Sequence, residues 1–231
     1  MRGTTTLKQL QQDLLTEVGD EARQFGFKLN KTYYSFRRKT TFGWQAFGIS
    51  PVVHPEIDFD ITVNVSIGFE ALTELFNKYD STRDAEQKRN GKFNFGAELG
   101  NIAEGRPKRY TVTTSADITP VTHAVISDLT LFGFPYLAKY STLESVLEDI
   151  VADDESWTAF LLMPFHDVRA KSAIGIAYLL GQQERFKEIA VSKEAYLISM
   201  KAPEFQLESF RKFRDELEVL FGREEKPDTA K

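Results

Sequence analysis

Cysteine is absent from the 231 residues of this chain, and histidine occurs only three times. The lack of cysteine excludes disulfides, thiolate zinc sites, iron–sulfur ligation and a cysteine nucleophile. The histidines, His54, His123 and His166, are too scattered in the sequence to form a local zinc motif. The chain has no run of about 18 apolar residues, which argues against a transmembrane segment. It also has no glycine-rich phosphate loop.

Neither sign of charge dominates, since 34 acidic residues oppose 29 basic ones and give a net charge of −5. This mild acidity argues against a dedicated nucleic-acid-binding protein. A hydrophobic content of 42% is that of an ordinary globular protein. Residues 1–6 lead into an amphipathic segment and not into the apolar core of a secretory signal, so we expect a cytoplasmic protein.

Phenylalanine is abundant, with 19 residues, and aromatic residues together make up 13% of the chain. Each buried aromatic side chain removes roughly 150–250 Å² from water. Because most of these residues fall at periodic positions, we interpret them as core. An aromatic surface for bases or for a partner protein is the alternative.

The first half of the chain has the pattern of strands. Residues 57–69 alternate apolar and polar side chains with a period of two, which is typical of a strand with one face on the core. Five segments are predicted to be strands: residues 27–38, 40–50, 57–69, 93–102 and 109–115. The alternation favours antiparallel pairing. We expect a loop between Pro51 and Pro55, and a mobile loop over the polar residues 80–92.

Helical periodicity precedes and follows these strands. A helix is predicted from Leu7 to Phe25, capped by a residue of Thr4–Thr6 and ended by Gly26. Further helices are predicted to begin near Thr119, Ser141, Asp167 and Pro203. Ser141 and Glu144 match a capping box, and Asp167 is a candidate cap. The pattern of residues 195–200 fits either a strand or a turn.

Strands followed by helices indicate an α+β fold. We predict an antiparallel sheet of about five strands, covered by N-terminal and C-terminal helices. No linker rich in Pro, Gly or Ser interrupts the chain, so we predict a single domain over 1–222. It would be strand-rich over 27–115 and helix-rich over 116–222, with a loose charged tail at 223–231.

Asp58 and Asp60 are the candidates for metal chemistry. Two carboxylates two apart on a strand point to the same side and can share divalent metal ions. The preceding Gly48-Ile49-Ser50 is similar to the Gly-Ser turn of nucleotidyltransferases, although Ile49 separates the two residues here. Mg²⁺ would be the cofactor of such an enzyme, and under the other interpretations we expect no cofactor and no metal. In the alternative interpretation, both residues begin the solvated face of the strand.

Charged residues gather in two sets. An acidic set without lysine or arginine could face a basic protein partner: Glu148, Asp149, Asp153, Asp154 and Glu155. A basic set could bind the phosphates of a single-stranded nucleic acid: Arg37, Arg38, Lys39, Lys88 and Arg89. Tyr33, Tyr34 and Phe36 lie near part of the basic set and could stack on bases. In the alternative interpretation, both sets are ordinary charged residues on solvated helix faces and turns.

Four motifs occur in a recognisable order. Phe25-Gly26-Phe27-Lys28 precedes Trp44-Gln45, the regular strand 59–68 follows, and Phe134-Pro135-Tyr136 leads to Ser141-Thr142-Leu143-Glu144. Over about residues 7–190 this order resembles a group of small bacterial domains of unknown function, some found near polymorphic-toxin and immunity loci. The resemblance implies an α+β bacterial cytoplasmic protein with a binding or immunity-like role, and it supplies no catalytic residues.

The absence of a convincing catalytic constellation favours a non-enzymatic protein that binds a protein partner. The partner would bind the polar face of the sheet or the acidic set. A metal-dependent nucleotidyl or phosphoryl transferase using Asp58 and Asp60 is the first alternative. Single-stranded nucleic-acid binding through the basic set is the second. We expect no membrane partner.

Overall fold

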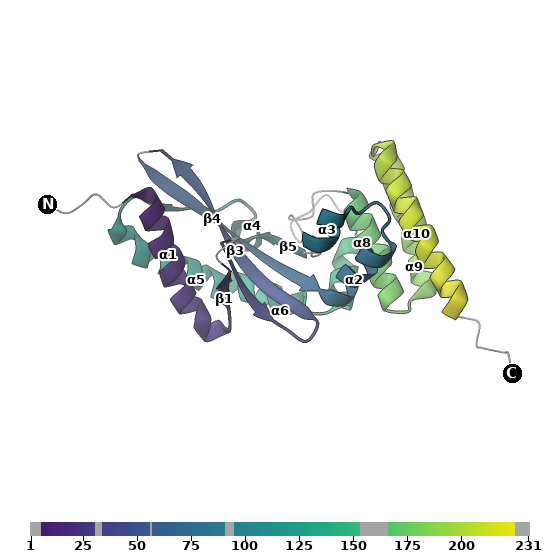
Figure 1. Cartoon of the computed structure of the whole chain (residues 1–231), viewed down its shortest axis with the longest axis horizontal. Coiled ribbons are helices and arrows are strands. Elements are labelled where there is room, and N and C mark those ends of the chain that lie inside the picture. The colour runs from purple at the N-terminus through teal and green to yellow at the C-terminus, as the bar shows by residue number, and fades with distance from the viewer. Residues whose placement is uncertain (1–5, 31–33, 56, 91–94, 153–165, 225–231) are drawn as a thin grey trace. The chain divides into compact units, whose positions relative to one another are not determined.

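The computed structural model of the chain describes residues 6–30, 34–55, 57–90, 95–152 and 166–224 (Figure 1). These residues divide into two compact units. The sheet unit comprises the described residues of 6–67 and 95–139, and the helical unit comprises those of 68–90, 140–152 and 166–224. The single domain expected from the sequence stays a prediction, and the two units are described separately.

The sheet unit is built on an antiparallel sheet of six strands. They are β1 (Lys28–Asn30), β2 (Ser35–Lys39), β3 (Gly43–His54), β4 (Asp58–Phe69), β5 (Phe95–Glu98) and β6 (Tyr110–Val112). The spatial order is β1-β2-β3-β4-β5, and β6 also pairs with β4. The predicted α+β fold with an antiparallel sheet in the N-terminal half is therefore confirmed.

Strand β4 shows why the sequence forms this sheet. Its side chains alternate between half-buried and buried from Asp58 to Ile67, and Phe59, Val65 and Ile67 are completely inaccessible to solvent. A period of two places all the apolar side chains on one face. This face is the one that the core uses.

Four α-helices and short helical turns complete the sheet unit. They are α1 (Leu7–Ala22), α4 (Leu99–Glu104), α5 (Ile118–Asp128) and α6 (Phe134–Lys139), with short turns η1 (Arg23–Phe25) and η2 (Ser115–Asp117). Helices α1 and α5 pack against each other (Figure 1). The Thr6 side chain accepts a hydrogen bond from the Gln9 backbone N–H (3.2 Å), which confirms the predicted N-terminal cap of α1. Gly26, with φ 81°, ends η1 as predicted.

One wide π-helical turn, η3 (Leu129–Gly133), joins α5 to α6. Pro135 follows it and has no N–H to donate to the preceding turn, so a regular α-helix would be interrupted there. At Gly133 a Cβ atom would lie 3.2 Å from Val65 of β4 and 3.3 Å from Leu99 of α4. The glycine therefore lets this turn approach the sheet closely.

The helical unit consists of six helices in the described residues. They are α2 (Glu70–Tyr79), α3 (Ala85–Asn90), α7 (Leu143–Val151), α8 (His166–Leu179), α9 (Gln183–Ser199) and α10 (Glu204–Glu224). Helix α8 is central, because α2, α7, α9 and α10 all pack against it. A Cβ at Gly175 of α8 would lie 3.2 Å from Leu72 of α2, so glycine permits this close packing. Within the described part of the chain, no helix combines the length and apolar character needed to cross a membrane.

Several predicted strand boundaries are wrong. The strand expected over 93–102 is only β5, because residues from Leu99 onward form α4. The strand expected over 27–38 is two strands, β1 and β2. Strand β3 continues through Pro51 to His54, where a loop was expected. Its partner β2 reaches only as far as Gly48 of β3, so on that side no described strand requires the missing N–H of Pro51.

Predictions in the helical half also need correction. Residues 195–199 belong to α9 and are neither strand nor turn. Thr142, and not Ser141, caps α7, since its side chain accepts a hydrogen bond from the Ser145 backbone N–H. The polar stretch 80–92 contains the short helix α3. Asp167 lies in the first turn of α8, which already begins at His166.

Candidate interaction site at the β3–β4 hairpin

The end of β3 and the start of β4 form a long hairpin. Residues 50–53 of β3 are solvent-exposed, whereas most of the preceding strand is buried. The backbone N–H of Ile57 donates to the carbonyl of His54 (3.1 Å) and closes the turn. The Asn64 side chain donates to Ser50 Oγ (3.4 Å), which places these even-numbered polar residues on one face. The odd-numbered residues of β3 therefore lie on the face that carries the core.

Apolar side chains are exposed around this hairpin. Tyr34 is 45% exposed, Val53 47% and Ile57 68%, and Pro51 is exposed as well. We call these four residues the hairpin patch. Single exposed apolar residues are common on protein surfaces, whereas contiguous ones often mark an interaction site. Of these four residues, Tyr34 and Pro51 line one niche together.

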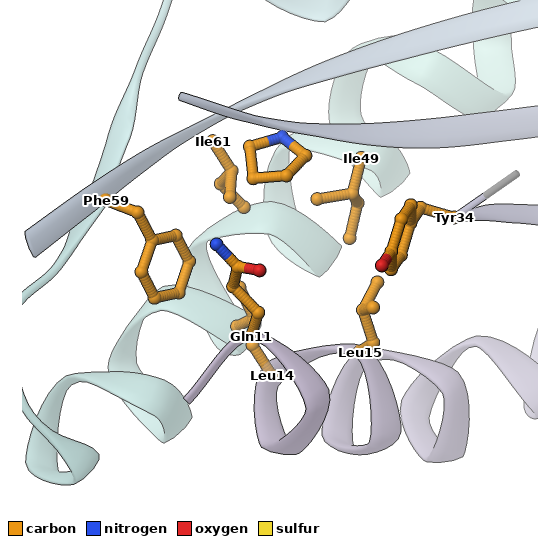
Figure 2. Close-up of a pocket in the computed structure, with 8 residues that line it drawn as sticks. Gln11, Leu14, Leu15, Tyr34, Ile49, Phe59 and Ile61 are labelled. Carbon is orange, nitrogen blue, oxygen red and sulfur yellow. The ribbon is translucent and has the colours of Figure 1, made fainter. Parts of the chain in front are cut away.

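A small apolar niche opens beside the hairpin patch (Figure 2). Its walls come from α1, β3, β4 and the residue preceding β2: Gln11, Leu14, Leu15, Tyr34, Ile49, Pro51, Phe59 and Ile61. Figure 2 shows the Tyr34 ring and Leu15 on one side of the niche and Phe59 on the other. Its volume is about 10 Å³, which is room for roughly one water molecule. A partner side chain would therefore have to displace the niche walls to enter it.

Tyr34 has a strained backbone. Its φ angle is 46°, in the left-handed region that bulky residues rarely occupy. The conformation is held by the sheet, because the Tyr34 carbonyl accepts a hydrogen bond from the Ile49 N–H (3.0 Å). Residues kept in such conformations cluster at functional sites. Strain and exposure thus coincide at one aromatic residue of the hairpin patch.

The opposite face of the hairpin carries a polar network. His54 Nδ1 lies 2.5 Å from Asp58 Oδ1, and His54 Nε2 lies 4.0 Å from Asp60 Oδ2. The Thr111 hydroxyl of β6 donates to Asp60 Oδ1 (2.6 Å), and Arg109 approaches Asp60 Oδ2 (3.4 Å). The hydrogen bond from Thr111, with the charges of Arg109 and His54, lowers the pKa of Asp60 below its usual value. Asp60 therefore carries its negative charge at neutral pH.

The two aspartates predicted for metal chemistry do lie on one face, since both approach the same imidazole. His54 was missed as their neighbour, although its position four residues before Asp58 was the available signal. Among the residues that the structure describes, no group of three or more His, Asp or Glu side chains has the arrangement of a metal site. Metal binding by Asp58 and Asp60 stays a prediction.

The basic set is divided between the two units. Arg37, Arg38 and Lys39 lie on β2 in the sheet unit, and Lys88 lies on α3 in the helical unit. The guanidinium of Arg37 lies 5.1 Å from the Trp44 ring centre. Arg89 is also on α3, but its side chain lies outside the described residues. Nucleic-acid binding by these residues stays a prediction.

The Arg38 guanidinium is hydrogen-bonded to other parts of the sheet unit. Its guanidinium donates to Gln45 Oε1 (2.7 and 2.9 Å) and to the Phe25 carbonyl (2.9 Å), and lies 4.6 Å from the Phe27 ring centre. Gln45 is buried and in turn donates to the Leu137 carbonyl of α6 (2.8 Å). Burial lowers the pKa of the Arg38 guanidinium. This residue therefore links β2 and β3 to α6 and has few donors left for a phosphate.

The acidic set is described only in part. Glu148 is exposed on α7 and accepts a hydrogen bond from Arg185 (2.7 Å). Asp149 accepts one from the Tyr140 hydroxyl (2.5 Å). The other three members, Asp153, Asp154 and Glu155, lie outside the described residues. A role for this set in partner binding stays a prediction.

Comparisons with known proteins do not assign the chain to a group. No protein-family description, no curated protein and no solved structure matches it.

Proposed function

We propose that this protein is a non-enzymatic interaction protein that binds a protein partner through the hairpin patch. The observation that carries the proposal is the exposure of four apolar side chains at the hairpin, Tyr34, Pro51, Val53 and Ile57, of which Tyr34 and Pro51 line an apolar niche. A partner that covers these side chains would remove their apolar surface from water, which favours association by roughly 25 cal/mol per Å² before the costs of binding. The role agrees with what the resemblance to immunity-like bacterial domains implies.

The partner surface is expected to present an apolar side chain toward Tyr34 and Pro51. The polar network on the opposite face of the hairpin would support partner binding by holding the hairpin in one conformation. The contact between His54 and Asp58 spans the turn, and the contacts of Asp60 join β4 to β6. A hairpin fixed in this way loses less conformational entropy on binding than a mobile one.

Affinity capture with matched variants tests this proposal. The bait proteins are the wild type, Ile57→Lys, and the control Leu131→Lys, which alters an equally exposed side chain (62%) of η3 in the same unit. We expect one stoichiometric protein to be retained by the wild type and the control. This captured protein should bind Ile57→Lys at least about tenfold more weakly than it binds the wild type, which corresponds to about 1.4 kcal/mol.

Two results would contradict the proposal. Equal retention by Ile57→Lys and the wild type would show that the partner binds elsewhere. Loss of all captured material after nuclease digestion would favour nucleic-acid binding by Arg37, Lys39 and Lys88.

A further inference from the structure

Helix α9 carries apolar side chains on two sides. The helix packs against α8 and α10, and its buried side chains include Phe186 and Leu197. On the outer side Val191 is 72% exposed and Ile198 56%, and Ala195 between them is exposed as well. Steps of four and three residues place these three side chains along one line of the helix, and we call them the α9 stripe. A surface helix normally turns polar residues toward water, so an apolar stripe there indicates a docking surface.

The two ends of the α9 stripe carry opposite charges. Glu188 lies about one turn before Val191, and Lys201 lies just beyond the end of the helix; both are exposed. In the part of the chain that the structure describes, no ion pair involves either of them. The Lys201 backbone has a φ of 52° and is held by its N–H, which donates to the Ile198 carbonyl (3.0 Å). The stripe is therefore acidic at one end and basic at the other.

This arrangement is complementary to itself in the antiparallel direction. With a rise of about 1.5 Å per residue, Val191 and Ile198 lie about 5 Å on either side of a midpoint beside Ala195. Glu188 and Lys201 lie about 10 Å on either side of the same midpoint. A two-fold axis at this midpoint brings Val191 of one copy of the chain level with Ile198 of another. It also brings each Glu188 level with the Lys201 of the other copy.

The residues at the midpoint permit a close approach of two helices. The small side chain of Ala195 is compatible with helix axes about 8–10 Å apart. The adjacent Glu194 brings no unpaired charge to this point, because its carboxylate is bound by Arg211 (2.6 Å) and Arg214 of α10. Charge and size thus both fit a second copy of the same helix.

We propose that two copies of the chain associate through the α9 stripe, with their α9 helices antiparallel. Such a contact uses the same surface of both copies and closes at a dimer. Because one helix face is a small interface, the dimer should dissociate on dilution. The α9 stripe belongs to the helical unit and the hairpin patch to the sheet unit, and this inference does not depend on the function proposed for the hairpin patch.

Sedimentation equilibrium of the full-length protein over a wide range of concentrations tests the proposal. The wild type should show a monomer–dimer equilibrium, and Ile198→Lys should raise its dissociation constant at least about tenfold. The matched control is Val219→Lys, which changes an exposed valine (51%) of α10 and should leave the constant unchanged. Ile57→Lys, which tests the hairpin patch, should also leave it unchanged.

Charge reversal tests the antiparallel arrangement. Glu188→Lys and Lys201→Glu each place like charges level with one another twice in the dimer, so each should weaken association at least about threefold. The double variant restores both pairs in reverse and should recover the association of the wild type. All these positions are exposed, so the unfolding midpoints should match that of the wild type.

A cysteine at the midpoint gives an independent measurement. Because the chain has no cysteine, Ala195→Cys introduces a single thiol, and mild oxidation should link two copies by a disulfide. Val219→Cys is the control and should stay unlinked. A wild type that remains monomeric at every concentration would overturn the proposal. So would an Ile198→Lys variant that associates as tightly as the wild type, or a double charge variant that does not recover association.

Discussion

The imidazole of His54 contacts the carboxylate of Asp58 across the β3–β4 turn, with 2.5 Å between Nδ1 and Oδ1. Asp60 lies near the other ring nitrogen and is bound in turn by Thr111. The sequence placed the two aspartates on one side of a strand, and the structure adds a histidine and a second strand to them. These contacts connect β3 to β4 and β4 to β6, and they lie on the face of the hairpin opposite the hairpin patch.

The stability of the sheet unit should depend on the charge of Asp60. Its pKa is lower in the folded protein than the usual value of about 3.9, so folding favours the ionised form. The resulting stability is present above the unfolded pKa and is lost as the pH falls through the folded pKa. We therefore expect the free energy of unfolding, measured with urea, to fall less from about pH 7 to about pH 3 for Asp60→Asn than for the wild type.

Thr111→Val is the matched variant for this experiment. It keeps the carboxylate but removes the hydroxyl that donates to it, so it should reduce the acid dependence in the same direction. Parallel pH profiles for the wild type and both variants would show that Asp60 is not stabilised in its ionised form.

Gly100 should not tolerate a side chain. A Cβ atom there would overlap the backbone nitrogen of Lys108 and lie 2.7 Å from the Arg106 carbonyl oxygen. Alanine normally favours a helix over glycine by about 1 kcal/mol, but backbone atoms cannot move aside as a flexible side chain can. We expect Gly100→Ala to lower the free energy of unfolding by about 1–3 kcal/mol, measured by urea denaturation.

Gly48→Ala is the control, since a Cβ at Gly48 meets no atom within 4 Å. Its free energy of unfolding should change by less than about 1 kcal/mol, because only the entropy of the unfolded chain is altered. Equal effects at Gly48 and Gly100 would mean that the close approach of α4 to residues 106–108 does not limit stability.

Local patterns predicted the parts of the fold that local forces decide. The alternation in β4 places every apolar side chain on one face, so this strand could be recognised without knowledge of its neighbours. Thr6 and Gly26 act through hydrogen bonds and a backbone angle within a few residues. These predictions are confirmed because nothing distant competes with them.

Contacts that local patterns do not reveal explain several of the predictions that were wrong. Leu99–Glu104 is apolar enough for a strand, but Gly100 lets the segment pack as a helix against residues 106–108. Arg38 looked like a surface cation because its partners come from two other places in the chain, the segment Phe25–Phe27 and Gln45. The hairpin patch was missed because Ile57 was assigned to the core face of a predicted strand, whereas Pro51 and Val53 fell in a segment that was predicted to be a loop.

Arg38 should contribute to stability and not to binding of nucleic acid. Arg38→Met removes hydrogen bonds to Gln45 and to the Phe25 carbonyl, and it leaves buried polar atoms without these donors. Hydrogen bonds that involve a charged group contribute about 1.5–3 kcal/mol, and we expect a loss of that size in urea unfolding. Lys39→Met, which changes the exposed neighbour, should alter stability by no more than about 0.5 kcal/mol.

The same pair of variants separates structure from function. If Arg38 binds phosphate, Arg38→Met should retain the stability of the wild type and should reduce both the affinity for single-stranded DNA and its salt dependence. That outcome would contradict the structural role.

The helical unit contains a buried ion pair that should be essential for its stability. Lys171 of α8 donates to Asp80 (2.8 Å) and to Ser209 of α10 (2.9 Å), and the Asp80 and Lys171 side chains are only 2% and 5% exposed. Thr82 also donates to Asp80 (2.5 Å), so the network links the end of α2 to α8 and α10. Removing one member of such a pair leaves a buried charge without its partner, at a cost of about 3–5 kcal/mol.

Lys171→Met should therefore lower the free energy of unfolding by about 3–5 kcal/mol, measured by urea denaturation. Asp80→Asn should also destabilise the protein. The double variant should lose less than the sum of the two single variants, because Lys171 and Asp80 contact each other directly. Lys212→Met, which changes an exposed lysine beside the same network, is the control and should lie within about 0.5 kcal/mol of the wild type. Additive losses would show that Lys171 and Asp80 stabilise the helical unit independently and not as an ion pair.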